Sequence, residues 1–216
     1  MKKIFLISFC LSILALAIFI NFEPRISTAA SDVATTTVTL IVASEISVTA
    51  DATISMSPNI SMSQDTSIGN ATFNVKTNDT AGYTMSFHAS SSPALRNADD
   101  SFTDYTELVE GTPESWSVAT GAYEFGFSAY GTDVDNGTWD GGNSSCGSAG
   151  ADSLSTSVNW MGFNSTTPVT GVATKSSETS QVGEDTVLCV AAEQGDSVFA
   201  PNGTYNASVV GTVTTQ

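Results

Sequence analysis

The chain has 216 residues, of which 22 are acidic and only 6 are lysine or arginine, so its formal net charge is −16 at pH 7. Nucleic acids and anionic membrane surfaces are bound through clustered basic residues, and this composition argues against both partners. Hydrophobic residues make up 41% of the chain, which is enough to build a packed core and argues against a disordered protein.

The first thirty residues have the pattern of a secretory signal peptide. A basic start at Met1–Lys3 is followed by an apolar run over Ile4–Ile20 and by the small residues Ser27–Ala30. An uncleaved membrane anchor is the alternative, because the run approaches the length of a short membrane span. We therefore predict a signal peptide over 1–30, a single domain over 31–216, and a secreted, extracellular or cell-surface location.

Removal of this leader makes the chain more acidic. Three basic residues and one acidic residue leave with it, so the chain from Ser31 keeps three basic and twenty-one acidic residues (3 − 21 = −18). Such a charge keeps an exported protein soluble through mutual repulsion, and it also offers carboxylates for cation binding.

Hydrophobic residues after the leader alternate with period two, and no helical pattern persists over helical length. This predicts an all-β fold: a single antiparallel Ig-like or Greek-key β-sandwich of about eight to ten strands with two long acidic loops. The leader would precede it as an N-terminal signal helix.

The first strand signal covers Thr35–Thr49, as one long strand or as two strands joined by a bend near Ser44. Val38, Leu40 and Val42 share one face of it.

Two further strands are predicted over Ala71–Thr77 and Tyr83–Ala89, and the turn residues Asn78–Gly82 between them favour a hairpin. Alternation in the second of these strands predicts three buried side chains, those of Tyr83, Met85 and Phe87. His88, the only histidine, lies on the opposite face and is expected to be exposed.

The second half contains two acidic connections, Ser90–Pro113 and Gly131–Asp152. Further strands are predicted around Trp116 and over Ala122–Tyr130, Ser157–Phe163, Asp185–Ala192 and Gly203–Thr215. Within the second of these, alternation predicts that Tyr123, Phe125 and Phe127 face the core.

Two cysteines remain after the leader, Cys146 and Cys189, because Cys10 lies in the apolar run of the signal peptide. An even pair in an exported protein predicts a disulfide, with two buried free thiols as the alternative. Closing a loop of this length stabilises a fold by about 4 kcal/mol in the chain-entropy account.

The segment Asp133–Asp140 is the candidate cation site. It is a glycine-bearing loop that places three carboxylates at short spacing, as a Ca²⁺ site would: Asp133, Asp135 and Asp140. The spacing does not match an EF-hand, and the alternative is an Asx/Gly turn with solvated carboxylates. No other cofactor is predicted.

Trp139 lies in the same loop and is the candidate ligand-binding residue. We expect its ring to be exposed, where it could stack on a sugar ring. Trp116 and Trp160 lie in alternating segments and are expected to belong to the core.

The sequence predicts no enzyme and no catalytic residue. It lacks the motifs G-x-S-x-G and H-E-x-x-H, and His88 has no evident catalytic partner. A pair of carboxylates of the glycosidase type stays open, because the spatial separation of the acids is not visible in the sequence.

Two stretches carry a resemblance: Thr77–Met85 (TNDTAGYTM) and Gly203–Val209 (GTYNASV). They resemble the T-N-x-x-x-G-Y hairpin and the terminal G-T-Y-x-A-x-V strand of poorly characterised bacterial secreted and surface β-sandwich proteins. The layout is also distantly similar to spore-coat-U-like and pilin domains. This resemblance implies a surface-exposed module without enzymatic activity.

The sequence therefore favours a secreted or cell-surface structural or adhesive β-sandwich protein. Its expected partners are other envelope or surface proteins or further copies in self-assembly, with no nucleic acid and no membrane contact after leader cleavage. The alternative is an extracellular glycan- or calcium-binding module that uses the Asp133–Asp140 loop. A secreted hydrolase that uses carboxylates is the third hypothesis.

Overall fold

The computed structural model describes residues 32–139, 145–146, 154, 158–163 and 167–216. Contacts divide the chain into two units, Met1–Ile41 and Val42–Gln216. The described part of the first unit, residues 32–41, has no regular secondary structure and is exposed throughout. The predicted signal helix lies outside the described residues. No helix long and apolar enough to span a membrane occurs in the part of the chain that the structure describes.

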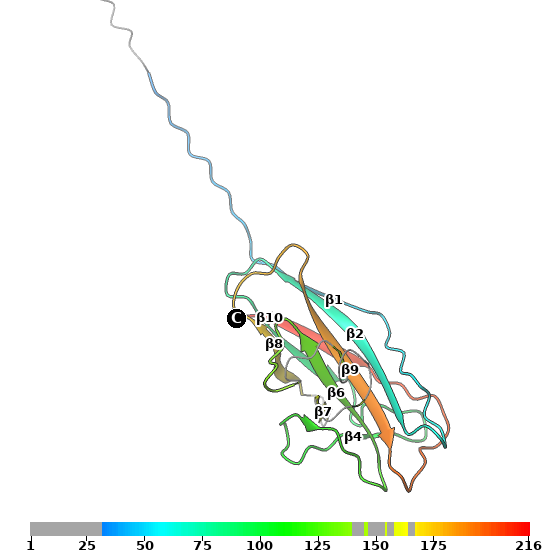
Figure 1. Ribbon diagram of the computed structural model, residues 1–216. Coiled ribbons are helices and arrows are strands. Elements are labelled where there is room, and N and C mark those ends of the chain that lie inside the picture. The colour runs from blue at the N-terminus through cyan, green and yellow to red at the C-terminus, as the bar shows by residue number, and fades with distance from the viewer. Residues whose placement is uncertain (1–31, 140–144, 147–153, 155–157, 164–166) are drawn as a thin grey trace, which may run out of the picture. The chain divides into compact units, whose positions relative to one another are not determined.

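The second unit is an all-β sandwich, as the alternation predicted (Figure 1). In its described residues there are ten strands: β1 (Ile46–Ala50), β2 (Thr66–Thr77), β3 (Tyr83–Ala89), β4 (Thr103–Asp104), β5 (Glu114–Ser115), β6 (Tyr123–Gly131), β7 (Asn159–Gly162), β8 (Val169–Lys175), β9 (Glu184–Gln194) and β10 (Val209–Thr215). The large sheet has the order β1-β2-β9-β6-β7-β5, with β4 also pairing with β6, and the small sheet has the order β10-β3-β8. All neighbours are antiparallel except β4 and β6, which are parallel.

The first predicted strand is wrong over its N-terminal part. Residues 35–45 form no strand, and β1 begins only at Ile46, where it pairs with Thr77 of β2. An apolar alternation fits a strand only where a neighbour supplies backbone partners and a surface to cover. Residues 35–41 carry the pattern without such a neighbour.

The predicted hairpin is also wrong, although both of its strands form. β2 belongs to the large sheet and β3 to the small sheet, so the loop Asn78–Gly82 crosses from one sheet to the other. Packed sheets lie about 10 Å apart, a gap that five residues can span. Phe73 of β2 and Phe87 of β3 consequently face each other across the interior, with ring centroids 4.9 Å apart.

The core between the sheets agrees with the predicted alternation. Tyr83, Met85 and Phe87 are fully buried, and so are Phe125 and Phe127 of β6. Burying side chains of this size removes large apolar areas from water, which is the main force that holds the two sheets together. Tyr123 at the start of β6 is half-buried, and its hydroxyl donates a hydrogen bond to Asp100 at 3.0 Å.

The expectation that His88 is exposed is only partly met. The side chain is half-buried, and Nδ1 is buried without a hydrogen-bond partner. The face of β3 that carries His88 is not open to water, because Glu110, Gly111, Met161 and Phe163 line a small cavity with it.

A second hydrophobic cluster covers the outer face of the large sheet. Tyr105 stacks on Trp116 with ring centroids 4.5 Å apart, and Trp116 meets Trp160 edge to face at 5.4 Å. Trp116 and Trp160 are therefore buried, as predicted, but in this outer cluster. The middle of the large sheet is thus buried on both faces.

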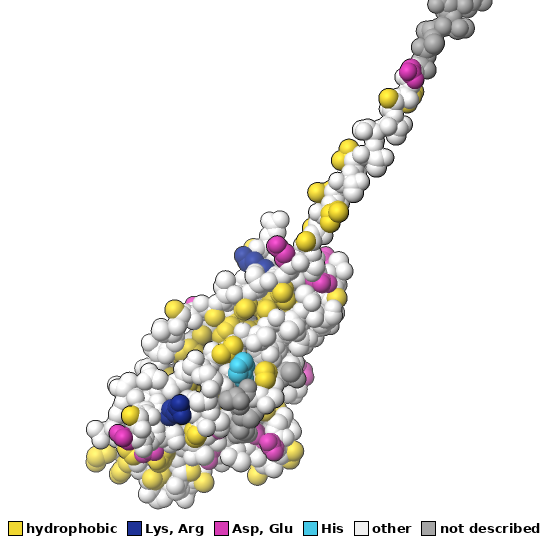
Figure 2. Space-filling view, turned by 180° about the vertical axis from the view of Figure 1, so that it is seen from behind, with side chains coloured by type: hydrophobic (Ala, Val, Ile, Leu, Met, Phe, Trp, Pro, Cys, Tyr) yellow, Lys and Arg dark blue, Asp and Glu magenta, His cyan; other side chains and the backbone are white. Residues whose placement is uncertain are grey.

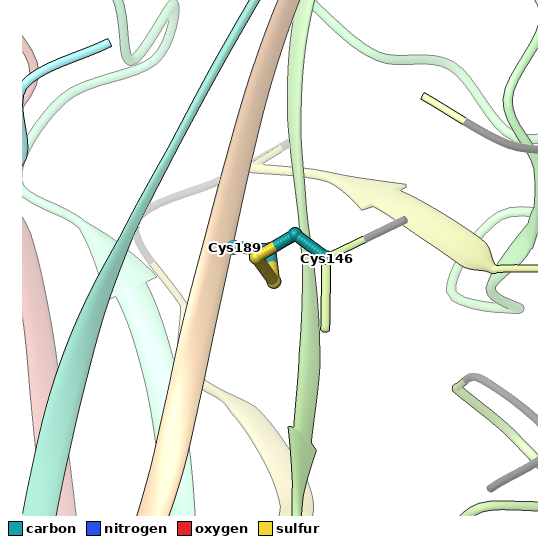
Figure 3. The surroundings of a disulfide bond; sticks show 2 residues. All are labelled: Cys146 and Cys189. Atoms are coloured by element: carbon teal, nitrogen blue, oxygen red, sulfur yellow. A yellow bond between two sulfur atoms is a disulfide. The ribbon is translucent and has the colours of Figure 1, made fainter. Parts of the chain in front are cut away.

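The predicted disulfide is confirmed. Cys146 and Cys189 are bonded, with Cα atoms 5.5 Å apart and a sequence separation of 43 (Figure 3). Cys189 lies on β9, a central strand, on the same face as the outer cluster. The bond therefore fixes the long Gly131–Asp152 connection to the middle of the large sheet.

Candidate functional site

The predicted calcium loop has its described carboxylates engaged in protein contacts. Asp133 accepts hydrogen bonds from the hydroxyl of Tyr83 at 3.0 Å and from Nζ of Lys175 at 3.4 Å. Asp135 accepts hydrogen bonds from the backbone N–H of Gly137 at 3.0 Å and from the hydroxyl of Thr138. The Thr138 and Gly137 contacts lower the pKa of Asp135, because they stabilise its charged form.

Asp140 lies outside the described residues, so the complete predicted set cannot be followed in space. Within the described ranges, no group of three or more His, Cys, Asp or Glu side chains gathers as metal ligands would. The calcium site stays a prediction. At Asp135 the contacts match the alternative given by the sequence analysis. The side chain forms an Asx turn, in which its carboxylate bonds Gly137 and Thr138.

Lys175 connects this loop to two strands. Its Nζ lies 3.4 Å from Asp133 and 3.3 Å from Glu184 at the start of β9. Burial, followed by the hydrogen bond to Asp133, raises the pKa of Tyr83 above its ordinary value. Tyr83 therefore stays a neutral donor to the Asp133 carboxylate, and the group of residues holds the loop against β3 and β8.

The expectation that Trp139 is exposed is wrong. Its side chain is only 3% exposed, and it packs on Phe127 with ring centroids 5.3 Å apart. The loop folds its aromatic residue into the core because an indole gains more from burial than from contact with water. No flat, open ring face is left at Trp139 for a sugar.

The outer face of the large sheet holds a pair of carboxylates that the sequence did not single out. Glu124 of β6 and Glu193 of β9 lie directly opposite each other in the antiparallel register. Burial raises the pKa of both side chains, and the charge of Glu193 raises that of Glu124 further. Trp116 donates a hydrogen bond from Nε1 to Glu193 at 2.7 Å.

A wide opening lies between the two sheets on the side of β1 and β10. These strands are the last of their sheets, and they lie near each other without pairing (Figure 1). Beyond this approach the two sheet edges separate. Inward-facing side chains along both edges are consequently only half-buried: Ile46, Val48, Ile54, Met56, Ile60, Tyr205, Val209 and Val213.

Two adjoining cavities fill the opening, with volumes of about 490 and 710 Å³. They share Met56, Leu95 and Tyr205 in their walls, so we treat them as one groove and call it the edge groove. Segment 51–62 forms one wall, and segment 199–209 forms the other.

The floor of the edge groove follows the alternation of one strand. Every second residue of β9 lines it, and these residues are Leu188, Val190, Ala192 and Gln194. Phe73 also lines the groove, and its ring packs against Gly211 of β10, where an added Cβ would lie 2.6 Å from the ring. Glycine at 211 therefore lets the sheets close there.

The edge groove is almost free of charge. Asp51 is the single charged residue in the linings of its two cavities, although the chain has 22 acidic residues. Figure 2 shows a band of hydrophobic side chains across one face of the domain, with the visible acidic side chains toward its margins. An uncharged apolar opening in so acidic a chain favours apolar and uncharged occupants.

One wall of the groove offers backbone groups. Asn206 exchanges both backbone hydrogen bonds with Arg96, at 2.9 and 3.1 Å. In an extended segment the neighbouring residues present their N–H and C=O groups to the opposite edge. Tyr205 and Ala207 are these neighbours, and their backbone groups make no hydrogen bond to another described residue.

Sequence reasoning missed the edge groove. Three of its floor residues lie in the predicted strand Asp185–Ala192, but nothing in an alternating pattern tells how far two sheet edges lie apart. The available signal was weak. It consisted of apolar side chains outside the predicted strands, such as Met62 and Phe199, which are 83% and 62% exposed.

Comparison with protein-family models, with curated proteins and with solved structures finds no match to this chain.

Proposed function

We propose that this protein is a secreted or cell-surface structural or adhesive β-sandwich without catalytic activity, which acts by taking up an extended polypeptide segment in its edge groove. The observation that carries the proposal is the uncharged apolar groove along an unpaired sheet edge. Addition of a strand to such an edge uses backbone hydrogen bonds for affinity and alternate side chains for selectivity.

The chemistry of the groove supports a polypeptide occupant. Tyr205 and Ala207 offer backbone donors and acceptors at the rim, while Leu188, Val190 and Ala192 form an apolar floor. A strand laid along the rim would direct every second side chain toward that floor. The signal-peptide pattern and the disulfide are both compatible with a protein that works outside the cell.

The two alternative functions have less support. The glycan-binding hypothesis depended on an exposed Trp139, and that side chain is buried. The hydrolase hypothesis has a carboxylate pair in Glu124 and Glu193, but neither lines the edge groove, and Glu193 is engaged by Trp116.

A peptide-display library panned on the exported protein tests the proposal. We expect the enriched peptides to be uncharged and apolar at alternate positions. Their binding should be lost in Ala207→Asp, which adds a charge to an exposed position in the wall of the groove. Val182→Asp is the matched control, since Val182 is 79% exposed and lies outside the groove lining.

Two results would contradict the proposal. Enriched peptides without alternation would mean that the edge does not accept a strand. Equal binding to the Ala207→Asp and Val182→Asp variants would mean that the peptides bind elsewhere.

A further inference from the structure

We infer that the occupant of the edge groove is residues 36–42 of a second copy of this chain, added as a strand. This inference rests on the proposed function and names its partner. It starts from residues 33–44, which we call the arm. The arm contains the N-terminal part of the predicted strand Thr35–Thr49 and forms no strand.

The arm carries the side chains of a half-buried strand without any burial. Val38, Leu40 and Val42 share one face of the alternation and are 88%, 84% and 73% exposed. Exposure of several large aliphatic residues within one short segment is unfavourable in water, and it marks a surface that another one covers.

Charge separates the arm from the rest of the chain. Not one charged residue occurs from Val33 to Ser44, although acids occur on both sides, at Asp32 and Glu45. The edge groove has the same property, with Asp51 as its single charged lining residue. Arm and groove can therefore approach each other without the repulsion that the other surfaces of this acidic protein would generate.

The lengths also agree. The groove floor on β9 extends from Leu188 to Gln194, which is seven residues. The segment Thr36–Val42 of the arm has the same length. Both are extended chains with a side-chain period of two, so alternate arm residues meet successive floor residues. Thr37, Thr39 and Ile41 then face outward, so the outward face has two polar residues and the inward face has the three aliphatic residues Val38, Leu40 and Val42.

The arm of the same chain fits the groove less well. Ala43–Glu45 is fixed to the loop between β2 and β3, because Asn78 bonds the Ala43 carbonyl at 2.8 Å and the Glu45 N–H at 2.7 Å. These bonds hold the arm's origin at the start of β1, whereas the groove begins at Asp51, beyond its end. A chain that doubled back would use the residues before Ala43 to pass β1, so Val38–Val42 would not reach the floor.

An arm that enters the groove of the next copy leaves its own groove free for another arm. The contact is therefore heterologous, and repetition of it builds an open chain of copies rather than a closed dimer.

Light scattering coupled to size-exclusion chromatography of the protein, exported from its full-length precursor, tests this inference. We expect the mass to rise with concentration in steps of one copy. Leu40→Asp should leave a monomer, because it puts a charge on the face that enters the groove. Thr39→Asp places the same charge one residue away on the opposite face and should preserve assembly. Both changes lie outside the folded domain, so the fold itself is not at risk.

A mixture gives the sharpest result. Leu40→Asp keeps a working groove, and Ala207→Asp keeps a working arm, so each alone should be monomeric and the mixture should stop at a dimer. A wild-type monomer at every concentration, or equal effects of Leu40→Asp and Thr39→Asp, would overturn the inference. Peptides selected by the groove from the display library would then still support the proposed function with a different partner.

Discussion

Replacing Phe87 by alanine is the most direct test of the sandwich core. The side chain is fully buried on β3, and its ring lies 4.9 Å from that of Phe73 on β2 and 6.5 Å from that of Phe127 on β6. It thus connects the small sheet to two strands of the large one. Truncation of a buried phenylalanine costs about 3 to 5 kcal/mol through lost transfer energy and the remaining cavity.

That loss is a large part of the roughly 5 to 15 kcal/mol by which domains are stable. At about 2 to 4 °C per kcal/mol for a domain of this size, the melting temperature should fall by roughly 10 °C. Urea denaturation of the oxidised protein gives the free energy directly. Phe199→Ala is the matched control, because the same atoms are removed from a ring that is 62% exposed. Similar losses in the two variants, or less than about 1 kcal/mol for Phe87→Ala, would refute the assigned register.

Three further predictions concern covalent and charged groups. Replacing Cys146 and Cys189 by alanine should cost about 4 kcal/mol in urea denaturation, and a loss under about 1 kcal/mol would contradict the 43-residue loop argument. Burial raises the pKa of Glu124 and of Glu193, and the charge of Glu193 raises that of Glu124 further, so the folded state binds more protons than the unfolded state just above the ordinary glutamate pKa of 4.5. Stability should therefore fall as pH rises through that window, and Glu193→Gln should flatten the fall whereas the exposed Glu178→Gln should not. If the calcium prediction holds, the melting temperature should rise with millimolar CaCl₂ but not with NaCl of matched ionic strength, and the rise should vanish in Asp133→Asn. Equal responses to both salts would mean that the ions only screen the acidic surface.

Local patterns predicted much of this fold because alternation decides which face of a strand is buried. Tyr83, Met85 and Phe87 are spaced two apart, and all three are buried as that spacing requires. The disulfide followed from the export signal and an even number of cysteines, neither of which needs a structure.

Spatial relations between segments were beyond the reach of those patterns. Asn78–Gly82 has turn residues that serve equally for a hairpin and for a crossing between sheets, and only the packing of Phe73 on Phe87 selects the second. β8 was not predicted because Gly171, with a positive φ of 74°, interrupts its short alternation.

The candidate site shows the same limit. The loop around Trp139 looked exposed because its neighbours are polar, but a single indole can turn inward while its loop stays at the surface. The edge groove lies where the edges of the two sheets are separated, along segments 51–62 and 199–209 next to β1 and β10. The distance between two sheet edges is not encoded by the period of any one strand.

Both ion pairs among the described residues use a single cation, Lys175, between Asp133 and Glu184. The chain has six basic residues for 22 acidic ones, so most carboxylates must find their counter-ions in the surrounding medium. Dissolved salt therefore contributes to the stability of this fold. It shortens the distance over which the carboxylates repel one another from about 30 Å at 0.01 M to about 3 Å at 1 M. Raising the ionic strength should therefore stabilise the folded domain, and dilution into low salt should weaken it.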